Sequence, residues 1–240
     1  MKAFLLSLFV ALLMVGCGEK EAVSVSPNFK YETQGDAITI TGFDRWVSGA
    51  LTIPTTIEGK TVTSIGSEAF SWCQELTSIA IPDSVNSMGK GAFSWCSSLR
   101  SITIPDSVTS IGVGAFSDCS NLRSITIGDS VTSIDGFAFA RCSNLKIIMI
   151  PDSVTSIGRD AFIRCTSLTS IIIAEGVTDI GSRAFNRCAS LTAVTLLGDA
   201  PKVGSGALEG SPSTIYRKPE TKGWDDTWAG RPVKLISEKP

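Results

Sequence analysis

Hydrophobic and polar positions recur along the chain with a period of 23 residues, and the period holds without insertion or deletion for seven units. In one unit, Leu99, Ile102 and Ile104 have an L-x-x-L-x-L spacing, with polar residues between the isoleucines. This alternation predicts a strand with one buried face. Pro105 ends the predicted strand because it has no N–H for further pairing. Each unit therefore supplies one short, half-buried strand.

The second half of each unit carries an Ala-Phe pair followed by a cysteine, here Ala115, Phe116 and Cys119. With Leu122, these residues take positions i, i+1, i+4 and i+7, which predicts one face of a short two-turn helix. A single unit has too few apolar side chains to offset the conformational entropy of ordering it, so neighbouring units must stack. The pattern predicts a mainly β solenoid with short helices.

Both ends of the repeat array depart from the pattern, as expected of the caps that a solenoid needs. Residues 29–57 are expected to form an N-terminal β cap that begins with a hairpin turning at Gly35-Asp36. The repeats are expected to fill residues 58–211. Residues 212–240 are expected to form a C-terminal cap, in which Trp224 and Trp228 cover the last layer.

The first residues are typical of an export signal. Lys2 precedes a nearly unbroken apolar run over residues 3–15, too short to span a bilayer comfortably. Met14-Val15-Gly16-Cys17 resembles a bacterial lipobox, which implies a signal peptide over 1–16, a lipid on Cys17 and a tether over 17–28. The chain is thus expected to be exported and lipid-anchored to the bacterial membrane, with Gly18 favouring the outer membrane or cell surface. An ordinary secretory signal is the alternative.

The repeat motif resembles that of the BspA-like, or treponemal-type, leucine-rich-repeat proteins. The resemblance rests on units such as Ile81-Pro82-Asp83-Ser84-Val85, and on Val108-Thr109-Ser110-Ile111-Gly112 followed by Ala-Phe-x-x-Cys. It implies a right-handed leucine-rich-repeat solenoid of about seven 23-residue repeats, with N- and C-terminal caps. Family members are mostly bacterial surface or secreted proteins, and some are implicated in adhesion.

The amino-acid composition limits the kinds of catalytic or binding site that can be expected. The chain has no histidine, which removes the commonest general base, and its formal net charge of −2 gives no global reason to expect nucleic acid as a partner. No nucleophile–base pair and no C-x-x-C pair stands out, and the array is unbroken. The sequence predicts no catalytic, metal or cofactor site. The recurring Asp83, Asp106, Asp129, Asp152 and Glu175 are expected to bond to backbone within turns, with Ca²⁺ binding as the alternative.

Six cysteines recur at the 23-residue spacing: Cys73, Cys96, Cys119, Cys142, Cys165 and Cys188. Stacked units bring neighbouring cysteines within disulfide range. A shared column also points their side chains in parallel and gives each a packing role as a small hydrophobe. We therefore expect buried thiols, with disulfides as the alternative that an exported location keeps open.

The position before each cysteine changes character, reading Trp72, Trp95, Asp118, Arg141, Arg164 and Arg187. A structural position would keep one residue type, so this column is expected to be exposed. Arg141, Arg164 and Arg187 are candidates to bind an anionic ligand, against the alternative of a solvated surface. A second candidate is an apolar patch of Ile147, Met149 and Ile172 on the outer face of the sheet, unless flanking residues or a second copy cover it.

These features favour a lipid-anchored, non-catalytic binding or adhesion module at the cell surface, whose partner is a protein or a glycan. Two other functions stay open. One is a structural envelope protein, and the other is a polysaccharide-active solenoid enzyme.

Overall fold

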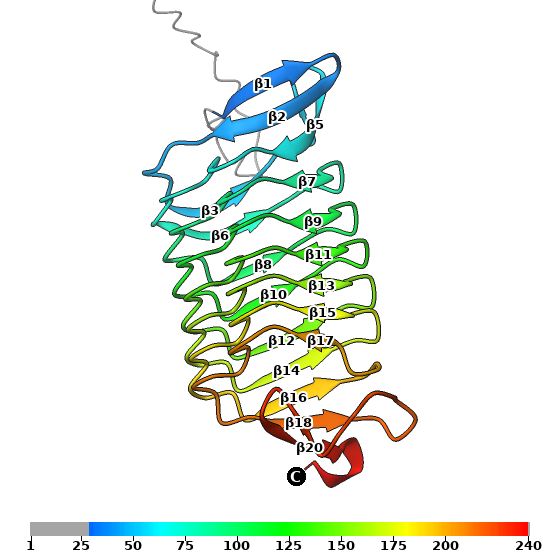
Figure 1. Cartoon of the computed structure of the whole chain (residues 1–240). Coiled ribbons are helices and arrows are strands. Elements are labelled where there is room, and N and C mark those ends of the chain that lie inside the picture. Colours follow the sequence, from blue (N-terminus) through cyan, green and yellow to red (C-terminus); the bar gives the residue numbers. More distant parts are fainter. Residues whose placement is uncertain (1–28, 240) are drawn as a thin grey trace, which may run out of the picture.

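The computed structural model describes residues 29–239, which form a solenoid of stacked coils (Figure 1). The expected signal peptide, the expected tether and Cys17 lie outside the described residues. Each repeat forms one coil with a longer strand and a two-residue strand, and like strands of successive coils pair in parallel, for example Ile102 with Ile125. The partners are 23 residues apart, so the sequence period is the coil.

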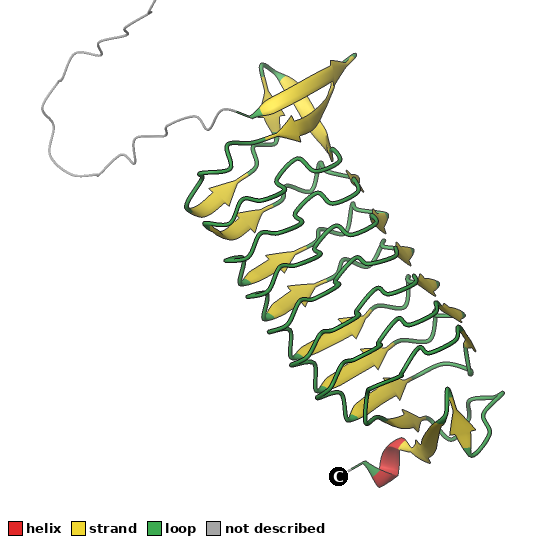
Figure 2. Cartoon of the chain, turned by 60° about the vertical axis from the view of Figure 1, so that its left-hand side comes forward, coloured by secondary structure: helices red, strands yellow, loops and turns green. Residues whose placement is uncertain are grey.

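The longer strands lie side by side along one side of the solenoid (Figure 2). They form two ladders. The first contains β3 (Gly49–Thr52), β6 (Leu76–Ala80), β8 (Ser101–Thr103) and β10 (Ser124–Thr126). The second contains β12 (Ile147–Ile150), β14 (Ser170–Ile173), β16 (Ala193–Leu196), β18 (Thr214–Arg217) and β20 (Arg231–Leu235), with β19 (Thr227–Trp228) antiparallel to β20.

The two-residue strands form a second face and continue an N-terminal cap. They are β7 (Ser87–Met88), β9 (Ser110–Ile111), β11 (Ser133–Ile134), β13 (Ser156–Ile157), β15 (Asp179–Ile180) and β17 (Lys202–Val203). They extend from β1 (Lys30–Gln34), β2 (Ala37–Gly42) and β5 (Lys60–Ile65), with β4 (Thr56–Ile57) paired to β5. The predicted hairpin is confirmed, because β1 and β2 pair antiparallel around Gly35.

The segment from each two-residue strand to the next longer strand, here called the turn side, contains turns and no α-helix. The expected two-turn helix at Ala115–Leu122 is therefore wrong. Each coil holds two residues in left-handed backbone conformation, such as Gly114 and Asp118, with φ near 60°. A right-handed helix cannot pass through such residues. The one helix among residues 29–239 is the 3₁₀ helix Ile236–Glu238.

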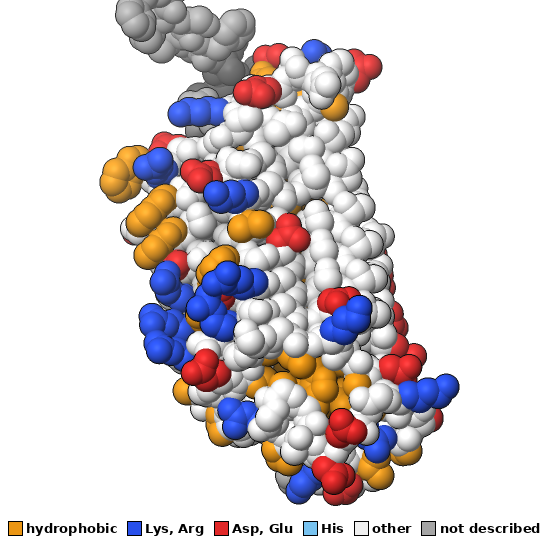
Figure 3. All heavy atoms as spheres, viewed as in Figure 1, with side chains coloured by type: hydrophobic (Ala, Val, Ile, Leu, Met, Phe, Trp, Pro, Cys, Tyr) orange, Lys and Arg blue, Asp and Glu red, His pale blue; other side chains and the backbone are white. Residues whose placement is uncertain are grey.

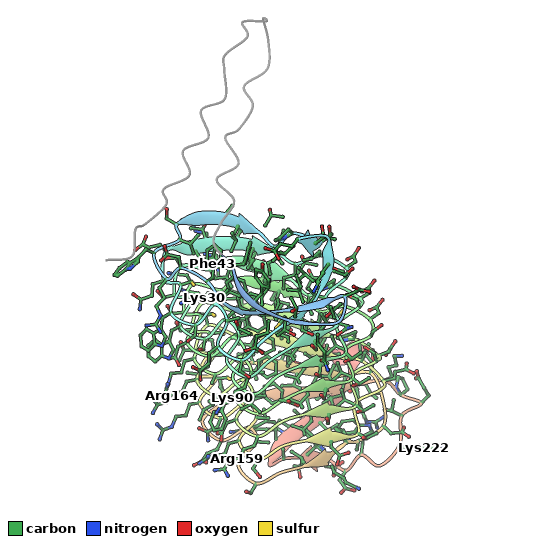
Figure 4. All side chains as sticks on the ribbon, turned by 90° about the horizontal axis from the view of Figure 1, so that it is seen from above. Lys30, Phe43, Lys90, Arg159, Arg164 and Lys222 are labelled. Carbon is green, nitrogen blue, oxygen red and sulfur yellow. The ribbon has the colours of Figure 1, made fainter. Side chains whose placement is uncertain are left out.

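The core is a ladder of phenylalanines. Rings of neighbouring coils stack with centroids 5.1–5.4 Å apart, in the order Phe70, Phe93, Phe116, Phe139, Phe162 and Phe185. Phe43, seen inside the coils in Figure 4, lies 5.6 Å from Phe70 and covers the first ring. At the other end, buried Trp228 donates from Nε1 to the carbonyl of Pro201 at 3.2 Å. The caps thus cover the apolar ends of the stack.

The repeat cysteines are free, buried thiols. Five of the six thiols donate to the phenylalanine carbonyl of the preceding coil, as Cys142 does to Phe116 at 3.2 Å, whereas Cys73 donates to the carbonyl of Asp44. In the last coil Ser211 takes the cysteine position and donates to Phe185 at 2.7 Å. The cysteine therefore serves as a small buried donor, which agrees with the expectation of packed thiols over disulfides.

Within residues 29–239, no helix is long and apolar enough to cross a membrane.

Replacing Phe116 by Ala should lower the free energy of unfolding by about 3–5 kcal/mol, because it removes a fully buried ring from the middle of the ladder. Thr103→Ala, at an exposed position of β8, should cost less than about 0.5 kcal/mol. Urea denaturation of both variants checks this, and equal losses would contradict the assigned strand faces.

Alkaline pH should destabilise the fold. Burial raises the pKa of the Cys73 thiol to about 12 and raises the pKa of the Cys142 thiol further. Unfolded thiols ionise near pH 8.5, so their contribution to stability is complete below that pH and is lost as pH rises toward the folded values. The unfolding free energy should fall between pH 8.5 and 10.5, by on the order of 2 kcal/mol for a fully buried thiol.

Cys142→Ser is the matched control, since serine keeps the donor, as Ser211 shows, and does not titrate in this range. Denaturant melts at pH 7.5 and 10.5 should show a smaller loss for this variant than for the wild type. An equal loss would assign the alkaline effect to other groups.

Candidate functional site

The turn side exposes a single column of side chains along the solenoid. These are the residues before the cysteines, and each has φ between 57° and 66°: Trp72, Trp95, Asp118, Arg141, Arg164 and Arg187. Their backbone N–H groups bond to the next coil, as in Trp95 to Ser117 at 2.8 Å. The left-handed conformation turns each side chain outward while the next residue, cysteine, points into the core. The expected exposure of the column is confirmed for all but the half-buried Asp118.

Large side chains at this position are energetically unfavourable. A residue other than glycine in left-handed conformation costs about 1 kcal/mol or more. The last coil has Gly210 here, so the coil itself accepts the unstrained residue. Residues held at such a cost are often retained for function. The arginines at positions 141, 164 and 187 therefore point to a role beyond folding.

The column is aromatic toward the N-terminal end. The indoles of Trp72 and Trp95 stack with centroids 4.6 Å apart and planes inclined by 1°. Both are substantially exposed, and Trp46 in the loop before β3 is 86% exposed. Figure 3 shows hydrophobic side chains along the upper part of this edge of the molecule and Lys and Arg side chains below them. The turn side thus changes from aromatic to basic.

The three candidate arginines are not equivalent. Arg141 forms an ion pair with Asp118 of the preceding coil at 3.2 Å. Arg164 and Arg187 have no ion pair among residues 29–239. Since exposed ion pairs contribute little, Arg141 also remains available to a stronger anionic partner.

A groove of about 540 Å³ brings the three arginines together. It is also lined by Arg183, Glu209 and the ring of Phe137, and we call it the arginine groove. Four guanidinium groups face one carboxylate among these residues, and Asn186 donates to that carboxylate at 3.2 Å. The groove is therefore electropositive.

A buried carboxylate supports one wall of the groove. Asp160 is fully buried and accepts from Arg183 at 2.8 Å and from Arg159 at 3.0 Å. The bond to Asp160 raises the pKa of Arg183 and fixes its guanidinium. Arg183 is therefore a preorganised member of the groove, whereas Arg164 is free to move.

The second candidate lies on a different side of the molecule. Ile147 and Met149 on β12 are 59% and 61% exposed, and Ile172 on β14 is half-buried. Met149 pairs with Ile172, and Ile172 with Thr195 of β16. We call Ile147, Met149 and Ile172 the sheet patch. The sheet patch is separate from the arginine groove, because the patch lies on the longer strands and the arginines lie on the turn side.

The C-terminal cap limits the sheet patch. Lys239 donates to Thr195 at 3.3 Å, and its ammonium lies 5.7 Å from the ring centroid of Tyr216. Thr195 and Tyr216 are buried as a result. Flanking residues were the expected alternative to an exposed patch. They cover the outer face of the sheet from β16 onward and leave Ile147 and Met149 exposed.

Two of the five acidic residues of the tight turns, Asp106 and Asp152, bond between coils. Asp106 accepts from the backbone N–H of Asp129 at 3.0 Å, and Asp152 from that of Glu175 at 2.9 Å. Backbone bonding was expected, but the donor belongs to the next coil instead of the same turn. These carboxylates hold the register of the stack.

A further depression of about 610 Å³ lies beside the cap, lined in part by Glu175, Asp199 and Pro201. Glu175 is paired with Lys218, and Asp199 accepts from the backbone of Lys222. Both carboxylates therefore hold the C-terminal segment against the coils, and the other charged residues of the depression, Lys202 and Glu220, are of opposite sign, unlike the arginines of the arginine groove.

Sequence reasoning missed Phe137 as a site residue. It is 42% exposed, lines the arginine groove and has φ of 59° at a position where other coils have Gly91, Gly114 and Gly206. A phenylalanine at a position that is otherwise glycine or a charged residue was a signal available in the repeat alignment. Its coil also has Gly128 and Asp135 where other coils have proline and glycine.

The repeats match the model of the BspA type leucine rich repeat region in six copies, over residues 51–169 and 87–215. The chain belongs to this family. No curated protein matches the sequence significantly.

Solved structures of bacterial leucine-rich-repeat proteins share this fold. The leucine-rich-repeat protein of T. pallidum is 27% identical with a TM-score of 0.54, and the match covers 76% of this chain and 86% of that one. A protein from Eubacterium ventriosum is 26% identical with a TM-score of 0.60, covering 82% of this chain. The chain spans about half of that protein, 54% of its length. These similarities establish the fold. Any inference about the ligand therefore rests on the surface of this chain.

Arg164→Gly should raise the free energy of unfolding by about 1 kcal/mol, because glycine relieves the left-handed strain and the arginine side chain has no hydrogen bond among the described residues. Arg164→Ala, which keeps the strain, should not stabilise the protein. Parallel urea melts test the pair. A glycine variant that is less stable than the alanine variant would contradict the strain argument.

Proposed function

We propose that this BspA-type protein is an exported, lipid-anchored and non-catalytic module that binds a protein or glycan at the bacterial surface through its turn side. One observation carries the proposal. Arginines occupy three successive left-handed positions and converge in one groove, although the coil accepts glycine there.

The groups in the groove are arranged for binding. Asp160 is held by two arginines, and Glu209 accepts from Asn186. Both carboxylates are thus engaged by neighbours, while Arg164 and Arg187 face outward. The excess of guanidinium groups over carboxylates in the groove supports recognition of an anion over acid–base catalysis. The polysaccharide-active enzyme is the weaker alternative.

The sheet patch supports a second candidate function, contact with an apolar surface of a protein. Its support is the 59% and 61% exposure of Ile147 and Met149 on adjacent positions of one strand face. Because the patch and the groove lie on different sides, one partner need not touch both.

Anchoring is tested at the lipobox. Cys17→Ala should abolish labelling by a fatty-acid analogue and leave the chain unprocessed or released into the medium. Fractionation and labelling of cells that express the full chain measure this. A mutant that still fractionates as a lipidated membrane protein would refute the lipoprotein assignment.

Binding is tested with cells that display the full chain on arrays of proteins and glycans. Charge reversal at Arg141, Arg164 and Arg187 should weaken an anionic ligand, and the loss should shrink as salt rises, because screening already weakens the wild-type contact. Replacing Ile147, Met149 and Ile172 by Thr should weaken an apolar protein contact with little dependence on salt. If both variants bind as the wild type does, the binding site lies elsewhere on the chain.

A further inference from the structure

We propose that the ligand of the arginine groove is an acidic polysaccharide whose strand runs along the solenoid axis, with carboxylate or sulfate groups on Arg141, Arg164 and Arg187. This inference rests on the proposed function and specifies its ligand class. The argument uses the charge of the groove, the spacing of the column and the aromatic rings beside it.

Charge selects an anion. Four arginines and one glutamate line the groove, and the guanidinium groups of Arg164 and Arg187 lack an ion pair among residues 29–239. A guanidinium group presents two parallel N–H donors that match the oxygens of a carboxylate or sulfate group. A neutral ligand would leave the guanidinium groups of Arg164 and Arg187 without a charged partner.

Spacing separates a glycan from an acidic peptide. Equivalent rings of successive coils lie 4.6 Å apart for the tryptophans and 5.1–5.4 Å apart for the phenylalanines, so the column repeats about once per 5 Å. Successive pyranose units of a linear glycan advance by a similar distance, and rotation about the glycosidic bonds can turn the acidic groups of neighbouring units toward the same face. An extended peptide presents side chains of one face roughly every 6.6 Å. Its carboxylates would fall out of register by the third arginine.

Aromatic rings beside the arginines fit sugar rings. Phe137 is 42% exposed at the groove. The stacked Trp72 and Trp95 belong to the same column as Arg141 and lie three and two coils before it. The C–H faces of a pyranose are apolar and pack on aromatic rings, while its acidic substituents lie at the ring edge. A groove that holds the ring of Phe137 beside guanidinium groups therefore complements both the apolar face and the acidic substituents of an acidic sugar.

The experiment measures binding of the full-length lipoprotein, in neutral detergent, to four fluorescent probes. These are oligogalacturonate, which is carboxylated; dextran sulfate, which is sulfated and has no carboxylate; dextran, which is neutral; and poly-L-glutamate of matched charge. At least one acidic glycan should bind at least ten times more tightly than poly-L-glutamate, with dextran weaker still. The two acidic glycans distinguish carboxylate from sulfate recognition.

Arg141→Gln, Arg164→Gln and Arg187→Gln together should weaken the acidic glycan at least about tenfold, which corresponds to three exposed charge contacts of modest strength. The matched control removes three exposed positive charges elsewhere, with Lys202→Gln, Lys222→Gln and Lys234→Gln. Lys222 lies across the molecule from Arg164 in the view along the coils (Figure 4). The control should bind as the wild type does.

Phe137→Gly isolates the stacking contribution, and glycine is already present at this position in other coils, so the coil accepts it. It should weaken the acidic glycan several-fold with little dependence on salt.

Equal binding of poly-L-glutamate and the acidic glycans would overturn the inference in favour of an acidic protein partner. Equal losses in the arginine and lysine variants would overturn it in favour of non-specific attraction. Binding of a neutral glycan or an apolar protein would sink the inference and leave the proposed function standing. Absence of binding to any displayed protein or glycan would sink both.

Discussion

The structure depends on hydrogen bonds between coils on the turn side. The backbone N–H groups of alternate residues there bond to the next coil, as Phe93 does to Ala115 and Trp95 to Ser117, both at 2.8 Å. The residues between them form hydrogen bonds that close turns within their own coil. This alternation requires two left-handed residues per coil. One of them necessarily precedes the cysteine. The same bonding that stacks the coils therefore sets an outward-facing residue in every coil, and that residue is free to vary.

The sequence contains most of the fold. The strand faces, the hairpin at Gly35 and the buried thiols all follow from alternation and period, because these depend on which side chains reach the core. The helix at Ala115–Leu122 was wrong because its spacing fits any compact turn that buries the same residues. The information that excludes it is backbone conformation, for which the glycines at the left-handed positions, Gly91, Gly114, Gly206 and Gly210, were the sequence signals.

The candidate site was predictable in part. The arginine column follows from the period, and so does the neighbourhood of Asp118 and Arg141, which are one period apart. The roles of Arg183 and Phe137 do not follow, because each depends on how far a side chain reaches from its own coil. Asp160 is an example of a feature that the sequence pattern does not predict. Its burial results from two arginines that close over it, and the pattern of apolar positions carries no trace of that.

The stack also has mechanical consequences. Coils are joined by hydrogen bonds parallel to the solenoid axis and by stacked rings. The described fold begins at residue 29, at the N-terminal end of the stack, and the arginine groove lies between the coils of Arg141 and Arg187. A pull between the N-terminal end and an object held in the groove loads the first coils in series, like the rungs of a ladder. The last coils and the C-terminal cap stay outside the load path. Resistance to such a pull would be set by the Trp72 to Asp118 half of the solenoid, whereas resistance to heat depends on both ends.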